Sequence, residues 1–369
     1  MERKRIYLSS PTMHGEEQAF VQSAFDTNWV APLGPNVDAF EKEMADYIGG
    51  GYAAALSAGT AAIHLAVILA GVKEGDVVFA QSLTFAASVN PACYEKAKPV
   101  FIDSEPDTWN MDPVALEKAF EKYPHPAAVI AVHLYGTPSK IDRIRDICKK
   151  HQVPLIEDAA EALGSSFQGQ KLGTFGDYGI LSFNGNKIIT TGSGGMVVSN
   201  HSDWLEHARH LSTQAKSDEL NYLHDEVGYN YRLTNLQAAL GLAQMEQLES
   251  FIAHKNAMYH FYFERLNGKH GYGIMPFRAG VRSNKWFYSL YVSDECPLRR
   301  DDVIRALAAE KIQTRPIWGL IQDQADYPKN EHYGEALARH YLARIVNLPC
   351  STSLTQEDAQ RVVDTLLAL

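Results

Sequence analysis

Between about residue 50 and residue 200, short runs of strand-forming residues alternate with segments whose apolar residues recur at helical spacing. Such an alternation is typical of a mostly parallel sheet that is covered by helices. Helices are predicted at residues 60–70, 113–123 and 139–151. Strands are predicted at residues 52–57, 77–81, 99–103, 127–132, 154–158, 178–184 and 195–199. The first part of the chain is therefore predicted to form an α/β domain.

The pattern changes after residue 200. Residues 204–215 have helical spacing, and a long amphipathic run extends from residue 234 to about residue 266. Two more helices are predicted at residues 301–310 and 356–369, the second with Thr355 as its N-cap. Short strands are predicted at residues 286–292 and 312–315. We assign residues 1–250 to the large α/β domain and residues 251–369 to a smaller α+β domain, although no linker marks the boundary.

Composition narrows the class of protein. Of the 369 residues, 46% are hydrophobic and 21% are charged, which is typical of a globular protein. The formal net charge of −10 argues against a nucleic-acid-binding surface, which would be basic. The longest nearly apolar stretch, residues 61–72, is far shorter than the roughly 20 residues of a membrane span. No apolar signal-peptide region follows the N-terminal basic residues, so we expect a cytoplasmic protein.

The four cysteines lie far apart and have no paired spacing, which favours reduced thiols over disulfides or a zinc site. For a metal centre, the chain offers only the pair His207 and His210, without a nearby acidic partner in a zinc motif. We interpret this pair as a polar helix face and predict no metal centre.

The strongest local feature is an apolar strand that ends in acidic groups, at residues 155–161. In open α/β sheets, ligands bind at the carboxyl ends of the strands. A carboxylate at Asp158 would suit a positively charged atom of a ligand. The alternative interpretation is that Asp158 caps a following helix.

A second feature is a single lysine, Lys187, in a polar and glycine-rich segment that follows a predicted strand ending near Ser182. The residues after it are apolar and small, which leaves few neighbouring charges. A lysine in such surroundings can become a neutral nucleophile. The alternative is an ordinary exposed lysine.

A third feature is the turn that carries Gly59 and Thr60, between a predicted strand and an apolar helix. Backbone N–H groups at the start of the helix and the Thr60 hydroxyl could bind a phosphate, although a simple helix cap is the alternative. The chain lacks the glycine patterns of dinucleotide-binding and P-loop proteins.

Together, a phosphate site, an acid that can pair with a protonated ring nitrogen and a lysine that can form an imine are the parts that a pyridoxal phosphate enzyme requires. Phe85 follows a predicted strand and could stack on the pyridine ring, although an aromatic residue there is more often part of a core.

With these parts in place, the sequence resembles fold-type-I, aspartate-aminotransferase-like enzymes. Within them it resembles the DegT/DnrJ/EryC1/StrS family of nucleotide-sugar aminotransferases, over nearly the whole chain. Six ordered blocks carry the resemblance, namely residues 59–66, 98–103, 132–136, 156–162, 186–192 and 228–235. The resemblance implies a large, mostly parallel mixed sheet with helices on both faces, followed by a smaller C-terminal α+β domain.

The resemblance also assigns roles by position. It implies that Lys187 is the Schiff-base lysine, that Asp158 partners the pyridine nitrogen and that Phe85 stacks on the ring. Asn230 would reach the phosphate bound by a neighbouring subunit, which implies a homodimer with shared active sites. The remaining cofactor contacts would be Gly59, Thr60, Ser182 and, in a less defined role, Glu161.

Residues 184–186 resemble the branch of the family that makes 4-amino sugars, such as perosamine and bacillosamine-pathway sugars. Residues 28–34, 212–215, 282–286 and 314–318 look most like enzymes that aminate UDP-2-acetamido-2,6-dideoxy-4-ketohexose. Trp29 and Trp318 could then lie against a base or sugar face, and Lys285 and Arg315 could meet a diphosphate or the carboxylate of the amino donor. Core packing or surface ion pairs are the alternatives.

The implied reaction transfers an amino group from L-glutamate, through pyridoxal 5'-phosphate and its pyridoxamine form, to C4 of a nucleotide-linked 4-keto-6-deoxy sugar for bacterial surface glycan or glycoprotein synthesis. The alternatives are a GDP-perosamine synthase-like enzyme or an aminotransferase for dTDP-3-keto or 4-keto sugars. A sugar dehydratase that binds the cofactor usually has His in place of the lysine, so Lys187 argues against it. A regulatory protein of the same fold would not need the acid and lysine pair.

Overall fold

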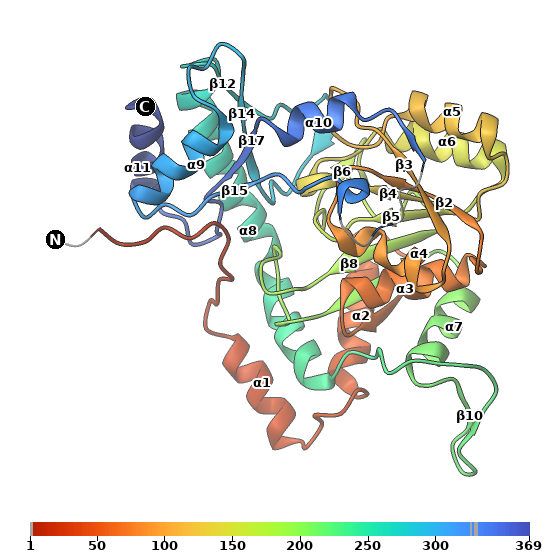
Figure 1. Cartoon of the computed structure of the whole chain (residues 1–369). Helices are drawn as coiled ribbons and strands as arrows, with labels where there is room; N and C mark the ends of the chain where they lie inside the picture. The colour runs from red at the N-terminus through yellow and green to blue at the C-terminus, as the bar shows by residue number, and fades with distance from the viewer. Residues whose placement is uncertain (1–2, 325–326, 328–330) are drawn as a thin grey trace.

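A computed structural model describes residues 3–324, 327 and 331–369 (Figure 1). Its main sheet has eight strands in the order β1-β9-β8-β5-β4-β2-β3-β16. β9 runs antiparallel to both of its neighbours, and the other strand pairs are parallel. In that order the strands are Tyr52–Leu56, Gly195–Ser199, Tyr178–Ser182, Leu155–Asp158, Ala128–Val132, Val77–Gln81, Lys98–Ile102 and His332–Tyr333. The predicted large, mostly parallel mixed sheet is confirmed.

Helices cover both faces of this sheet, because successive residues of a strand point to opposite faces. In β4, Ile130 packs in the core that includes α3 (Gly59–Leu69), whereas its neighbour Val129 packs in the core under α5 (Pro113–Lys122) and α6 (Ile141–His151). Both residues are fully buried. All three helices match the predicted segments to within two residues at either end.

Two helices near the N-terminus, α1 (Glu17–Asp26) and α2 (Pro35–Ile48), were not predicted from the sequence. α2 carries local signals for both of its ends. Pro35 occupies the first helical turn, and Gly49 ends the helix in the left-handed conformation, with φ of 103°. α2 buries Phe40 and Met44 in the same core as α5 and α6.

The C-terminal part contains a second, antiparallel sheet in the order β12-β14-β17-β15. The four strands are Tyr272–Ile274, Tyr288–Val292, Ile345–Leu348 and Arg315–Pro316. The helices α9 (Arg300–Ala309) and α11 (Gln356–Leu367) pack in its core, and Thr355 caps α11 as predicted, accepting a hydrogen bond from the Asp358 N–H. The strand predicted at residues 312–315 starts later, because Ile312 pairs only with Ile6 in an isolated bridge.

The long helix α8 (Asn235–Leu266) connects the two parts. A capping box of Thr234 and Gln237 fixes its start. Its N-terminal part contributes residues such as Leu242, Leu248 and Ile252 to the core of the main sheet, and its part from Tyr259 onward contributes to the C-terminal core. The division near residue 250 stays a prediction.

The remaining elements are short, apart from α7 (Ser202–Ser212). They are η1 (Ala86–Ser88), α4 (Asn90–Tyr94), η2 (Leu134–Gly136), β6 (Ser166–Phe167), β7 (Gln170–Lys171), β10 (Lys216–Asp218), β11 (Leu223–His224), β13 (Val281–Arg282), η3 (Ile321–Asp323) and α10 (Ala336–Leu342). None of the helices within the described ranges is long and apolar enough to cross a membrane. The four cysteines are free thiols.

Candidate active site

A cavity of about 680 Å³ lies at the carboxyl ends of the parallel strands, between the main sheet and residues of the C-terminal part. This is the edge at which open α/β sheets bind ligands. The cavity brings together residues that are as far apart in the sequence as Leu8 and Asn347. The predicted site residues in its wall are Gly59, Thr60, Phe85, Asp158, Glu161, Ser182, Lys187, Arg315 and Trp318.

One end of the cavity is formed by the N-terminus of α3. Ala58, at the N-cap position, offers no side-chain hydrogen bond to this helix end, so its first N–H groups face the cavity uncapped. Gly59 is needed for close packing, because a Cβ there would lie 3.0 Å from Cβ and 3.2 Å from Oγ of Ser182. Uncapped N–H groups beside the hydroxyls of Thr60 and Ser182 make a site for an anion such as phosphate.

Asp158 ends strand β5 with its carboxylate in the cavity wall and is only 4% exposed. Its Oδ2 accepts a hydrogen bond of 2.6 Å from the Ser88 hydroxyl, and its Oδ1 accepts one from the Ala160 N–H. A turn follows it, so the alternative interpretation as a helix cap was wrong. Within the described ranges, no ion pair is formed by Asp158. A buried carboxylate without a cation of the protein suits a cation of a ligand.

Lys187 also lines the cavity, and its side chain is 12% exposed. Its Nζ lies 3.5 Å from Oε1 of Glu161. The same Nζ is 4.0 Å from the centre of the Trp286 ring. Glu161 also accepts a 2.7 Å hydrogen bond from the Tyr135 N–H. Burial raises the pKa of Glu161 to about 7, against the opposing attraction of Lys187. The carboxyl group can therefore gain or lose a proton near neutral pH, next to the amine.

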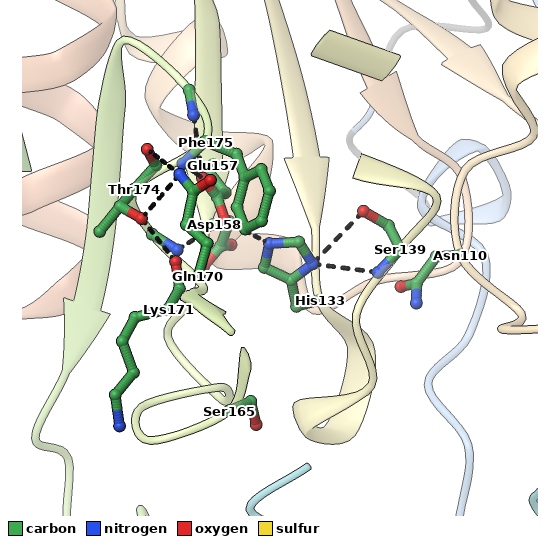
Figure 2. Close-up of polar contacts among 12 residues, drawn as sticks. Asn110, His133, Ser139, Glu157, Asp158, Ser165, Gln170, Lys171, Thr174 and Phe175 are labelled. Atoms are coloured by element: carbon green, nitrogen blue, oxygen red, sulfur yellow. Dashed lines mark hydrogen bonds and ion pairs between the residues drawn. The ribbon is translucent and has the colours of Figure 1, made fainter. Parts of the chain in front are cut away.

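A second buried polar pair, His133 and Glu157, lies next to Asp158 (Figure 2). Glu157 precedes Asp158 on β5 and points to the opposite face, where its Oε1 lies 2.7 Å from Nε2 of His133. The Ser139 N–H donates to Nδ1 of the same ring, so Nε2 carries the proton that Glu157 accepts. Three backbone N–H groups complete the shell of Glu157, those of Gly173, Phe175 and Gly176.

Aromatic rings form the wall nearest to the C-terminal part. The Phe85 ring is 54% exposed, in the cavity, with its centre 5.4 Å from that of Trp318. The Trp318 ring lies in turn 4.9 Å from the Tyr135 ring. Arg315 is exposed in the same wall, on β15. These groups suit a flat ring and an anionic group at the mouth of the cavity.

Three predicted site residues do not line the cavity of this single chain. Asn230 is exposed and pairs with Thr213 in an isolated bridge. Trp29 is 42% exposed. Lys285 is buried, with its Nζ 3.9 Å from the centre of the Tyr259 ring, and burial lowers its pKa to about 7. The roles of these residues stay predictions.

Sequence reasoning missed four residues that shape the site. Ser88 carried no local signal, since its bond to Asp158 joins residues 70 positions apart. Trp286, whose ring lies under Lys187, stood in a predicted strand. His133 and Glu157 fell within blocks of the family resemblance, which was the available signal, but neither was assigned a role.

The residues in the wall fit pyridoxal 5'-phosphate. The anion site at α3 lies in the same cavity as the Lys187 amine and the buried Asp158 carboxylate. In addition, Oδ1 of Asn186 is buried in this wall without a hydrogen-bond partner in the protein. Such an unsatisfied acceptor costs free energy unless a ligand or water pairs with it.

Comparison with known proteins shows to which family this chain belongs. Residues 11–367 match the model of the DegT/DnrJ/EryC1/StrS aminotransferase family. The chain belongs to this family. The family resemblance predicted from the sequence is thereby confirmed.

Individual relatives agree with this assignment. The chain is 46% identical to EpsN of Bacillus subtilis, over 99% of this chain and 96% of EpsN. It is 36% identical to the GDP-perosamine synthase of Caulobacter vibrioides, over 98% and 97% of the two chains. It is 31% identical to the UDP-4-amino-4,6-dideoxy-N-acetyl-beta-L-altrosamine transaminase of Campylobacter jejuni, over 91% and 90%.

A solved structure shows the same fold. The aminotransferase TlmJ of Streptoalloteichus hindustanus superposes with a TM-score of 0.93, at 26% identity, over 99% of this chain and 98% of that chain. This member of the DegT/DnrJ/EryC1/StrS family is therefore a pyridoxal phosphate-dependent sugar aminotransferase. When bound, the cofactor supplies an electron sink for carbanion charge and carries the amino group between the two half-reactions.

Proposed function

We propose that this aminotransferase transfers the amino group of L-glutamate to C4 of a nucleotide-linked 4-keto-6-deoxy sugar, with UDP-2-acetamido-2,6-dideoxy-4-ketohexose as the preferred acceptor. The observation that supports the transfer is the placement of Lys187 and Asp158 in one cavity with the anion site at α3. The product would serve bacterial surface glycan or glycoprotein synthesis.

In this proposal Lys187 binds the cofactor and moves the proton. Its Nζ would act as the general base and acid that moves the proton of the donor's α-carbon. Asp158 keeps the ring nitrogen protonated, and the Ser88 hydroxyl fixes the carboxylate in position. The partly buried Nζ of Lys187 has Glu161 at 3.5 Å as its proton partner.

The sugar nucleotide enters from the aromatic wall. Trp318 and Phe85 offer faces for a sugar or base, and Arg315 offers a cation for a diphosphate or for the carboxylate of the donor. Trp29 and Lys285 are further proposed substrate contacts, although neither lines the cavity of the isolated chain. Asn230 is proposed to complete the phosphate site of a neighbouring subunit in a homodimer.

Two relatives support different nucleotides. The Campylobacter jejuni transaminase is named for a UDP-linked 4-amino sugar, and the Caulobacter vibrioides synthase is named for a GDP-linked sugar. The UDP-linked N-acetyl sugar is preferred because four segments resemble enzymes that aminate it, namely residues 28–34, 212–215, 282–286 and 314–318. A GDP-linked 4-keto-6-deoxy sugar is therefore the second candidate.

One spectroscopic experiment tests both the donor and the acceptor. The holoenzyme is first treated with L-glutamate, and the loss of the visible band of the cofactor is followed. The converted enzyme is then challenged separately with UDP-, dTDP- and GDP-linked 4-keto-6-deoxy sugars. Fast return of the band with the UDP-linked N-acetyl sugar alone supports the proposal. Return with the GDP-linked sugar alone would favour the second candidate, and no loss of the band with glutamate would contradict the proposed donor.

A further inference from the structure

A buried histidine, His64, lies on α3 one helical turn beyond the anion site. It stands four residues after Thr60, so the two side chains share one face of the helix. Thr60 lines the active-site cavity, whereas His64 is not part of the cavity wall and is only 4% exposed. The proposed amino transfer uses the anion site at the start of this helix but leaves the imidazole without a role.

Both nitrogens of this imidazole have a partner. Nε2 lies 2.8 Å from Oε1 of Glu95, and Nδ1 lies 3.1 Å from the hydroxyl oxygen of Tyr231. A carboxylate only accepts, so Nε2 carries a proton, and Nδ1 of the neutral ring accepts the hydroxyl proton of Tyr231. Glu95 thus fixes the tautomer with which His64 binds Tyr231.

Tyr231 belongs to an extended segment that also contains Asn230. The Tyr231 N–H donates to the Ser212 carbonyl, and the Tyr231 carbonyl accepts from the Ser57 N–H, so the segment is bonded on both sides. The rings of Tyr229 and Tyr231 stack with their centres 4.9 Å apart. In an extended chain, alternate residues share a face and the residue between them points to the other. The two rings on one face therefore direct the side chain of Asn230 away from α3.

The His64 ring also packs against both of these tyrosines. Its centre lies 5.0 Å from that of Tyr229, in an edge-to-face arrangement, and 5.9 Å from that of Tyr231. The Tyr94 ring meets it edge-on at 5.3 Å. Edge-to-face contacts of this kind are favourable beyond the apolar area that they bury. Replacing the imidazole would therefore weaken both the hydrogen bond and the packing that set the position of the two tyrosines.

Asn230 itself is held through its backbone. It is exposed, its backbone pairs with Thr213 in an isolated bridge, and its side-chain amide has no hydrogen bond within the part of the chain that the structure describes. The amide can therefore bind a group outside this chain, as the proposed homodimer requires. A symmetric dimer repeats each contact on both subunits, so each α3 would form the anion site of its own chain and support the asparagine that completes the partner's site.

We propose that His64 is a positioning residue that acts across the dimer. Through Tyr231 it holds Asn230 in the place from which the amide binds the cofactor phosphate in the neighbouring subunit. This inference rests on the proposed sharing of active sites. It extends that proposal, because it makes one helix of each chain responsible for both phosphate sites of the dimer.

Cofactor affinity measures the effect of His64. His64→Phe keeps a ring but loses both hydrogen bonds, and its apoenzyme is expected to bind pyridoxal phosphate on the order of tenfold more weakly in an absorbance titration. Tyr231→Phe removes only the hydroxyl and should weaken binding about fivefold. His64→Asn, whose side-chain oxygen can replace Nδ1 as the acceptor, should recover part of the loss. Tyr272→Phe deletes a buried hydroxyl of the C-terminal core and should leave the affinity unchanged.

A double variant separates positioning from a general loss of stability. If His64 acts through Asn230, His64→Phe combined with Asn230→Ala binds the cofactor no more weakly than Asn230→Ala alone, because the group that His64 positions is already absent. Losses of affinity that add up in the double variant would overturn the proposal.

Subunit mixing shows which chain His64 serves. His64→Phe is mixed in equal amounts with Lys187→Ala, and borohydride then fixes the cofactor only at sites that contain Lys187. After random exchange, about half of these sites have a Lys187→Ala partner, whose intact His64 supplies a correctly placed Asn230. These sites are expected to fill at the pyridoxal phosphate concentration of the wild type, and the remainder at the raised concentration. One weak phase alone, as in unmixed His64→Phe, would overturn the action across the dimer.

The same assay on Asn230→Ala mixed with Lys187→Ala tests the shared site separately. If this mixture forms no sites of wild-type affinity, Asn230 does not serve the partner, and both proposals are overturned. If it forms them while the His64→Phe mixture keeps only the weak phase, the role of His64 alone is overturned. Should His64→Phe fail to fold, Tyr231→Phe takes its place in the mixture, since it loses a single hydroxyl.

Discussion

The Lys187 amine and the Glu161 carboxyl group face each other across 3.5 Å, and only 6% of the Glu161 side chain is exposed. Glu161 lies in the turn after β5, where the Tyr135 N–H binds its second oxygen. Because desolvation outweighs the attraction of Lys187, the pKa of Glu161 rises to about 7. The Glu161 carboxyl group can therefore gain or lose a proton near pH 7, directly beside the Lys187 amine.

The raised pKa of Glu161 predicts a pH dependence of stability in the apoenzyme. Between its ordinary pKa of 4.5 and about 7, the folded chain keeps a proton that the unfolded chain has released. The unfolding free energy contributed by this group is therefore fully present below pH 4.5 and falls as the pH rises to about 7, by at most about 3 kcal/mol.

Glu161→Gln, which cannot titrate, should remove this component. Urea denaturation of the two apoenzymes at pH 5 and pH 8 measures it, because titrations shared by both proteins cancel in the difference. The variant should gain stability relative to the wild type at pH 8. An equal difference at both pH values would show that Glu161 does not titrate in this range.

Lys187→Ala is expected to abolish transamination, with a loss of more than about 10⁴-fold in turnover, because no other amine in the described cavity wall can act as base and nucleophile. The cofactor should still bind through the anion site at α3, but borohydride should no longer fix it to the protein. Lys118→Ala alters an exposed lysine of α5 and serves as the control. Multiple turnovers by the Lys187 variant, free of wild-type enzyme, would contradict the assignment.

Asp158→Asn removes the charge that we propose for the ring nitrogen, and we expect turnover to fall on the order of 10²–10³-fold. Ser88→Ala removes only the hydroxyl that donates to Asp158 and should cost roughly tenfold, the equivalent of one hydrogen bond. Steady-state kinetics of both half-reactions would show this gradation. If the Ser88 variant lost as much activity as the Asp158 variant, the hydroxyl would have a role of its own.

Gly59→Ala tests the anion site without changing any charge. The new Cβ would lie 3.0 Å from Cβ of Ser182, so either Ser182 or the start of α3 must shift. We expect the affinity for pyridoxal phosphate to fall by about tenfold, because the N–H groups at the helix start move from their positions. Absorbance titration of the apoenzyme measures this affinity. Gly273→Ala, whose Cβ meets only ordinary contacts, should leave it unchanged.

The site residues that could be predicted from the sequence are those that lie at or shortly after the end of a strand. Asp158 is the last residue of a strand, and Gly59 and Lys187 follow strands by a few residues; the carboxyl ends of parallel strands meet at one edge of the sheet. Ser88 and Trp286 reach the cavity only through tertiary packing, so no periodicity marks them.

Dependence on tertiary packing also explains why helix α1, the titration of Glu161 and the partners of His210 were not predicted from the sequence. α1 lies at the N-terminal end of the chain, and its contacts with α8 join segments some 200 residues apart. The titration of Glu161 depends on burial, which a sequence pattern does not quantify. His210 pairs with Asp225, which follows the hairpin of β10 and β11, and neither of these short strands was predicted from the sequence.

The proposed sharing of active sites predicts that two inactive variants restore each other. Lys187→Ala lacks the amine, and Asn230→Ala lacks the group proposed to reach the partner's phosphate site. In a mixed dimer, one site would combine the intact lysine of one chain with the intact asparagine of the other. The second site would carry both defects.

Random mixing of equal amounts of the two variants under exchange conditions should therefore restore about a quarter of the wild-type activity. The activity should exceed the sum of the two separate variants, and it should rise on the timescale of subunit exchange measured by light scattering of tagged mixtures. Mixing Lys187→Ala with Asp158→Asn is the matched control, because both defects lie in the cavity of one chain. The control would recover activity only if Lys187 and Asp158 of one site came from different chains. We expect it to recover none, because both residues lie in the cavity of one chain and only Asn230 is assigned to the partner.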